Sequence, residues 1–179
     1  MSIKDAHPDE ALRKAIYSRD LLQSRTWIEA ADRMTSAMSV LEPRLETWCR
    51  LMRESEGKAW GEIDDGGLLV YMLLGGYAVE NLCKGYLATM LSPAERELVA
   101  GGKLPPRFNH NVLELTKLTS ISLTAGDESL LTRLEAIIVW RGRYPVPKSA
   151  TKRQPTWDST SDTKRIRAII QRLRNRMSP

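Results

Sequence analysis

The chain has 179 residues, 42% of them hydrophobic and 27% charged, a balance that suits one globular domain spanning 1–179 and excludes a low-complexity polypeptide. Two cysteines and two histidines are too few for a disulfide framework or a zinc-finger-type site, so we expect reduced thiols, no metal and no cofactor. The net charge of +5 is uneven, because residues 151–179 carry +6 and residues 1–150 carry −1.

The N-terminal part, residues 8–54, predicts two helices. Pro8 followed by two acids opens the first helix, in which Leu12 and Ile16 recur at helical spacing. The second helix covers about 27–53 and has a continuous apolar face. Pro43 lies inside it and is expected to kink or split it.

The most apolar segment, about 68–91, predicts a central helix. Its longest charge-free stretch ends at Glu80, which is too soon to span a bilayer, so we expect a buried core helix and no contact with a membrane. Gly75 and Gly76 lower its helix propensity, and a close contact with another helix would explain them. Because the first residues also lack an apolar secretory signal, we expect a cytoplasmic protein.

Shorter helices are predicted downstream. Ser92-Pro93-Ala94-Glu95 has the pattern of a capping box and starts one of them. A helix at about 111–121 should turn Leu118 inward, and Asp127 should cap the next one. The basic C-terminal helix, 161–177, is expected to begin at Ser161 or Asp162. Its apolar face is formed by Ile166, Ile169, Ile170, Leu173 and Met177.

Polar side chains share one face of the central helix. Tyr77, Glu80 and Lys84 are three or four positions apart, and on so apolar a helix they should be buried in part and paired. Possible partners downstream are His110, just before a predicted helix, and a group at a helix end. That group consists of Arg141, Arg143 and Tyr144.

The run 74–87 resembles the central helix of the HEPN family (higher eukaryotes and prokaryotes nucleotide-binding). Residues 77–84 match a Tyr-Ala-x-Glu-x-Leu-x-Lys pattern of one subgroup. His110, with Leu113 and Leu115 after it, is similar to the family's histidine at a helix start, and Arg143-Tyr144-Pro145 is similar to its arginine segment. The resemblance covers about 66–147.

The resemblance implies an all-α, HEPN-like bundle of about six to seven helices, here with an extra basic C-terminal helix. It also implies a homodimer and a prokaryotic toxin–antitoxin or defence module with a partner protein from a second gene. Many members are metal-independent RNases with an arginine four to six residues before a histidine. Neither Arg141 nor Arg143 is followed by histidine at that spacing, so a non-catalytic member of the family is expected.

Three functions fit these observations. In the first, the group around Lys84, His110 and Arg143 binds a nucleotide or RNA through phosphate, with Glu80 orienting a cation. In the second, His110 is the general acid and base of an RNase toxin and Arg143 stabilises negative charge. In the third, the polar cluster is only structural, in a helical dimer or adaptor.

The basic C-terminal helix adds a separate hypothesis. Arg165, Arg172 and Arg176 would attract nucleic acid without reading its sequence. The alternative is a solvated face, or a helix that lies on an acidic patch of the same chain or of a second subunit.

Overall fold

The computed structural model describes residues 8–54, 66–141 and 159–177, which form seven α-helices, one π-helical turn and no strand. The all-α class predicted from the sequence is therefore confirmed. The helices are α1 Pro8–Leu22, α2 Ser24–Glu54, α3 Gly66–Thr89, α4 Pro93–Ala100, α5 Val112–Leu118, α6 Ala125–Ala136 and α7 Ser159–Met177, and the π-helical turn η2, Ile137–Arg141, directly continues α6.

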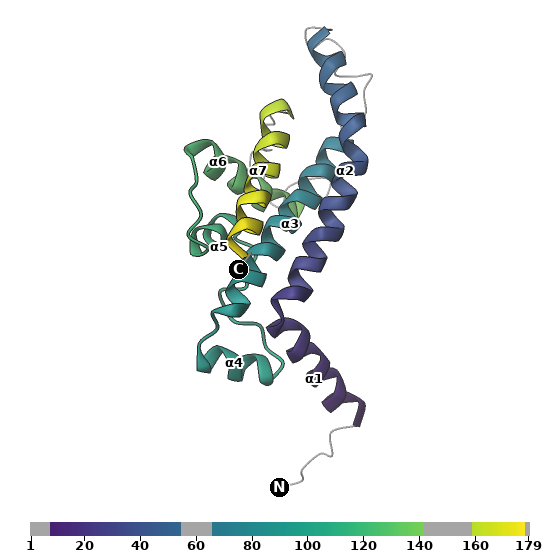
Figure 1. The fold of residues 1–179 in the computed structure, drawn as a ribbon. Helices are drawn as coiled ribbons and strands as arrows, with labels where there is room; N and C mark the ends of the chain where they lie inside the picture. Colours follow the sequence, from purple (N-terminus) through teal and green to yellow (C-terminus); the bar gives the residue numbers. More distant parts are fainter. Residues whose placement is uncertain (1–7, 55–65, 142–158, 178–179) are drawn as a thin grey trace.

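Helix α3 lies at the centre, as its composition predicts. The long α2 runs along one side of it, while α5, α6, η2 and α7 cover the other sides (Figure 1). Tyr71, Cys83 and Ala88, which lie on different sides of α3, are all at most 1% exposed. Burial on every side explains why this helix is apolar nearly all round, and why a polar residue within it needs a partner.

The two glycines of α3 let neighbouring helices approach closely. A Cβ on Gly75 would overlap the Cδ1 atom of Ile166 in α7, and a Cβ on Gly76 would lie 2.8 Å from Ile138 Cγ2 in η2. The close helix–helix contact expected from the sequence is therefore confirmed. These two positions fix α7 and η2 against the half of α3 that precedes Glu80.

Pro43 does not split α2, which runs unbroken through 31 residues. The expectation of a split was wrong because the same apolar face continues on both sides of the proline. Met38, Leu45 and Trp48 on that face are all buried, so packing of this face against the core holds the two halves together.

Several helix ends differ in detail from those predicted. Ser92 caps α4 through the predicted capping box, but α6 is capped by Thr124, and Asp127 is the third residue of its box. Helix α7 begins at Ser159, so Asp162 lies in its first turn. Helix α5 ends at Leu118, whose side chain is 49% exposed instead of turned inward.

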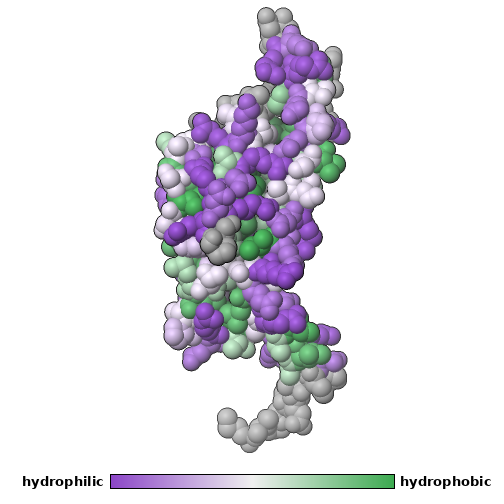
Figure 2. Space-filling model, viewed as in Figure 1, coloured by the Kyte–Doolittle hydropathy of each residue, from purple (hydrophilic) through white to green (hydrophobic). Residues whose placement is uncertain are grey.

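The two ends of the molecule differ in polarity. Hydrophilic side chains cover α7 and the adjacent face of α2, whereas apolar groups gather near α1 and α4 (Figure 2). The apolar spacing of α1 does not make a buried face, since Leu12 and Ile16 are 60% and 42% exposed. Within the described ranges, every helix is too short or too polar to cross a membrane.

Candidate functional site

Glu80 and Lys84 form a buried ion pair on α3. The Lys84 Nζ donates to Glu80 Oε1 at 2.5 Å, and the two side chains are only 6% and 7% exposed. Their i,i+4 spacing brings them together on one face, as expected from the sequence. Two charges this deeply buried lose most of their hydration, so each depends on the other for its stability in the core.

His110 approaches the same carboxylate from outside α3. Its Nδ1 lies 3.1 Å from Glu80 Oε1 and 3.2 Å from Oε2. Because an ionised carboxylate can only accept, Nδ1 carries the proton. Glu80, Lys84 and His110 thus form a trio of polar side chains. The His110 side chain is 56% exposed, so it is the member of the trio that contacts solvent.

The local sequence fixes the position of His110. The next residue, Asn111, is the N-cap of α5 and accepts from the backbone of Glu114 at 3.0 Å. On the other side, Phe108 is buried, and its amide closes a turn onto the Pro105 carbonyl at 2.9 Å. The histidine is thus held between an anchored aromatic ring and a helix start, which limits the positions that its own ring can reach.

Trp27 of α2 covers the cationic end of the ion pair. The Lys84 Nζ lies 5.8 Å from the centre of its ring, within the range of a cation–π interaction. The same ring meets Phe108 edge to face, at 5.8 Å between centroids, and its indole N–H donates to the Leu21 carbonyl at 3.0 Å. Helix α2 therefore helps to position both Lys84 and the segment that carries His110.

The trio can act on a ligand only through His110. With Nδ1 bound to Glu80, the imidazole Nε2 is left for solvent or a ligand, and no hydrogen bond to Nε2 forms within the described part of the chain. The carboxylate at Nδ1 orients the ring so that Nε2 can donate to an anion when it carries a proton and can accept a proton when it does not.

Cys83, which lies between the two charged residues in the sequence, is fully buried. Burial raises the pKa of its thiol to about 12, and its Sγ lies 3.6 Å from the Thr116 hydroxyl. Such a thiol stays protonated at neutral pH and is not a nucleophile. The expectation of two reduced, packed cysteines is confirmed, because Cys49 is buried and free as well.

The other predicted site residues are not brought to the trio by any described contact. Tyr77 is half-buried, packs on the core, and accepts from the Asn81 side chain through its carbonyl at 2.8 Å. Arg141 is the last residue of η2, and only its backbone is described. Arg143 and Tyr144 lie outside the described residues.

Comparisons of the chain with protein-family models, curated proteins and solved structures yield no match. The interpretation of the site therefore depends on its geometry. In the described ranges, no three His, Cys, Asp or Glu side chains are arranged to hold a metal ion.

The predicted nucleic-acid arginines all contact the chain itself. Arg172 donates to Asp127 Oδ2 at 3.0 Å and to the Ser122 carbonyl, and Arg165 lies 3.8 Å from the same carboxylate. Arg176 donates to the Tyr86 hydroxyl at 3.2 Å and lies over its ring.

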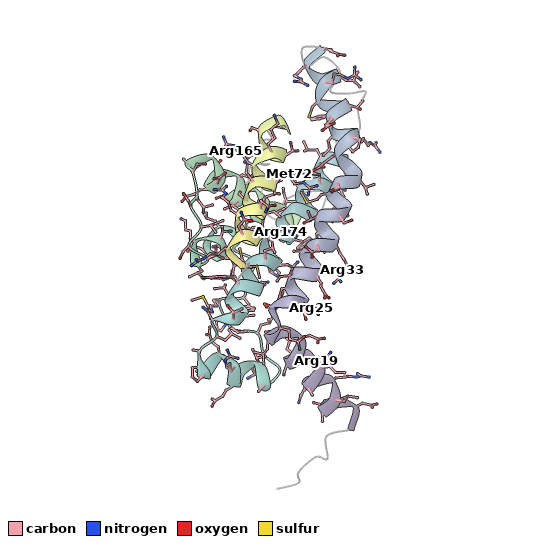
Figure 3. The ribbon with its side chains drawn as sticks, viewed as in Figure 1. Arg19, Arg25, Arg33, Met72, Arg165 and Arg174 are labelled. Carbon is pink, nitrogen blue, oxygen red and sulfur yellow. The ribbon has the colours of Figure 1, made fainter. Side chains whose placement is uncertain are left out.

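Other arginines of α7 contact acids on other helices. Arg174 pairs with Asp32 of α2, and Arg167 with Glu42. Figure 3 shows Arg165 near α6 and Arg174 further along α7. Much of the basic character of α7 is therefore compensated by acids of the same chain, which is the alternative considered from the sequence.

A second polar cluster has no counterpart in the sequence predictions. The Arg167 Nε donates to Glu42 Oε1 at 2.6 Å, and the Tyr71 hydroxyl donates to the same oxygen at 3.1 Å. Burial, opposed by the nearby Arg167, raises the pKa of Tyr71 to about 12, so the phenol is neutral. Glu42 and Arg167 are 125 positions apart, and no local pattern could have paired them.

Proposed function

We propose that this chain is a HEPN-like helical protein that binds a phosphate-bearing ligand, a nucleotide or RNA, at His110, without catalysing a reaction. The convergence of Glu80, Lys84 and His110 supports this proposal. The sequence singled out the Glu80–Lys84 pair of α3 and His110, which precedes α5. In the structure, Lys84 and His110 both contact the Glu80 carboxylate. A purely intrahelical ion pair would need no histidine beside it.

The chemistry of the trio favours an anionic ligand. Glu80 and Lys84 neutralise each other, so protonation of His110 gives the trio a net charge of +1 at the surface. A protonated imidazole donates a charge-assisted hydrogen bond to a phosphate oxygen. Binding should therefore weaken when His110 is replaced by a side chain that cannot carry a proton charge.

One observation also supports a second function, that of a metal-independent RNase. A carboxylate bound to Nδ1 orients the imidazole so that Nε2 can remove the proton from a ribose 2′-hydroxyl. The sequence favours binding over cleavage, because the family's arginine-to-histidine spacing is missing around Arg141 and Arg143. A third function, a structural dimer or adaptor, would need no ligand at all.

One set of measurements on one sample separates these functions. The purified protein is incubated with single-stranded RNA and with AMP, and both RNA length and thermal unfolding are recorded. Ligand-dependent stabilisation with intact RNA is expected. Loss of this stabilisation in His110→Gln, a variant that can still bond to Glu80 but carries no charge, would locate the ligand at the trio.

The other outcomes are equally informative. RNA cleavage that is lost in His110→Gln would replace the binding proposal with the RNase. Unchanged RNA and unchanged unfolding with either ligand would leave the structural function. Because His110 is more than half exposed, His110→Gln itself should change the free energy of unfolding by less than about 0.5 kcal/mol.

The resemblance to the HEPN family also implies an assembly of several chains. A homodimer and a partner protein from a prokaryotic two-gene toxin–antitoxin or defence module belong to the same proposal. Light scattering of the purified protein tests the homodimer directly, because a dimer has twice the mass of the 20.3 kDa chain.

A further inference from the structure

A cavity of about 950 Å³ lies between the second half of α2, the beginning of α3 and the beginning of α7. Its volume falls in the range of pockets that hold small organic molecules. The buried residues Leu45, Cys49 and Tyr71 contribute to its lining and give it an apolar floor. Pro43 lines the α2 wall, at the one point of that helix where no backbone amide is available.

Part of the lining is already neutralised. Glu42 binds both Arg167 and the Tyr71 hydroxyl, as described above, and Arg167 also donates to Ser39 Oγ at 2.9 Å. This arrangement joins all three helices at one side of the cavity. Its charges are paired, so it shapes the cavity but leaves no charge for a ligand.

The remaining charges of the lining are mostly positive. The lining contains three further cations, Arg50, Arg53 and Lys164, and one further carboxylate, Glu46. All four side chains are exposed. Arg53 donates from its Nε to the Cys49 carbonyl at 3.2 Å, and its terminal nitrogens form no hydrogen bond to other described residues. Arg50 has a 3.4 Å contact to Glu54, and Lys164 forms no ion pair within the described residues. The cations come from two helices, so an anion between them would be bound from both sides.

We propose that this cavity binds a small organic phosphate, with the phosphate between Arg53 and Lys164 and the apolar body against Leu45 and Cys49. A cationic rim over an apolar floor fits a molecule with one anionic end and one apolar end. Arginine is suited to the phosphate because its guanidinium can donate two parallel hydrogen bonds.

This site is separate from the trio at His110. Tyr71 and Glu80 are nine positions apart on α3, which corresponds to about 13 Å along the axis and to opposite sides of the helix. The inference therefore goes beyond the proposed function and does not depend on it. Ligand binding in the cavity should be the same in His110→Gln as in the unchanged protein.

Titration calorimetry of the full chain with phenyl phosphate, inorganic phosphate and phenol tests the proposal. Phenyl phosphate should bind with saturable heat and more tightly than either of the others, because only it has both a phosphate and an apolar ring. The double variant Arg53→Gln/Lys164→Gln should weaken it about tenfold or more. Arg25→Gln, which removes an exposed cation elsewhere on α2, is the matched control and should have no effect.

Glu46→Gln provides a test that misfolding cannot imitate. Removal of Glu46, the one carboxylate of the lining that forms no ion pair among the described residues, should strengthen phenyl phosphate binding by about threefold, as expected for one exposed charge. Absence of saturable binding, binding of phenol as tight as that of phenyl phosphate, or an unchanged affinity in the double variant would each overturn the proposal.

Discussion

Glu80 and Asp127 are both buried carboxylates that contact two basic side chains, but their surroundings differ. Glu80 depends on Lys84, which is as buried as itself, and on the exposed His110. Asp127 is 4% exposed, yet its cations Arg172 and Arg165 are 33% and 42% exposed. It also closes the cap of α6 by accepting from the Thr124 amide at 3.0 Å.

Glu80 belongs to an isolated buried ion pair, whereas Asp127 belongs to a network that it shares with two arginines. Lys84 has no water to solvate it if Glu80 is lost, whereas the arginines around Asp127 can turn to solvent. The Glu80 region should therefore be the more sensitive to loss of one charge. It also holds a histidine whose outer nitrogen has no hydrogen bond to any described residue, whereas the donors around Asp127 bind α7 to α6.

Glu80→Ala should have the largest effect on stability. It leaves a buried Lys84 unpaired, which costs about 3–5 kcal/mol of unfolding free energy. Urea unfolding followed by circular dichroism measures the loss. The double variant Glu80→Leu/Lys84→Met removes both charges and should recover most of it, since apolar residues of similar size can replace a buried pair. A double variant as unstable as Glu80→Ala would show that packing and not charge is decisive there.

Asp127→Asn should cost less, about 1–3 kcal/mol, through weaker hydrogen bonds to Arg172 and to the cap of α6. The exposed pair of Arg174 with Asp32 is the control, and Arg174→Gln should cost at most about 1 kcal/mol. Equal losses in the two variants would remove the distinction between a capping carboxylate and an ordinary surface pair.

The contribution of Asp127 to stability should also depend on pH. Burial opposes the ionisation of Asp127, but hydrogen bonds from Thr124 and Arg172 outweigh it and lower the pKa of this carboxyl. A lowered folded-state pKa contributes stability above the unfolded value of about 3.9, and this contribution is lost as the pH falls through the folded value. The stability difference between the unchanged protein and Asp127→Asn should therefore shrink below about pH 4.

The smallest effect is expected for nucleic-acid binding by α7. Replacement of Arg165, Arg172 and Arg176 with Gln should keep the fold, at a cost of about 1–3 kcal/mol, because Arg165 and Arg172 contact the buried carboxylate of Asp127. If these arginines bind RNA, the variant should flatten the dependence of affinity on salt, because fewer counterions are released. No RNA binding by the unchanged protein at low salt would confine the arginines to their intramolecular contacts.

Local features of the fold could be predicted from the sequence, and long-range pairings could not. The capping box of α4, the central apolar helix and the close contact at Gly75 and Gly76 follow from spacing within one turn or two. The inward position of Leu118 was wrong because α5 ends at that residue. The predicted split at Pro43 was wrong because the free-energy cost of a proline inside a helix is offset by packing along both halves of α2.

The same limit applies to the candidate site. Glu80 and Lys84 are four positions apart, so their pairing is local, whereas His110 was only a possible partner, named for its place before a predicted helix and for the family resemblance. The cavity beside Glu42 was missed because its cations and acids come from helices distant in the sequence. An unusual tyrosine in an apolar run, Tyr71, is the one local signal that could have drawn attention to it.

The contact between Glu42 and Arg167 has a consequence for biosynthesis. The two residues are 125 positions apart, and a ribosome adds about 5–20 residues per second. Glu42 is therefore synthesised roughly 6–25 s before Arg167, and Gly75 is synthesised roughly 5–18 s before Ile166 of α7, which packs against it. During this time the nascent chain exposes the apolar side of α3 that α7 later covers, so the growing chain is most exposed to aggregation just before α7 emerges.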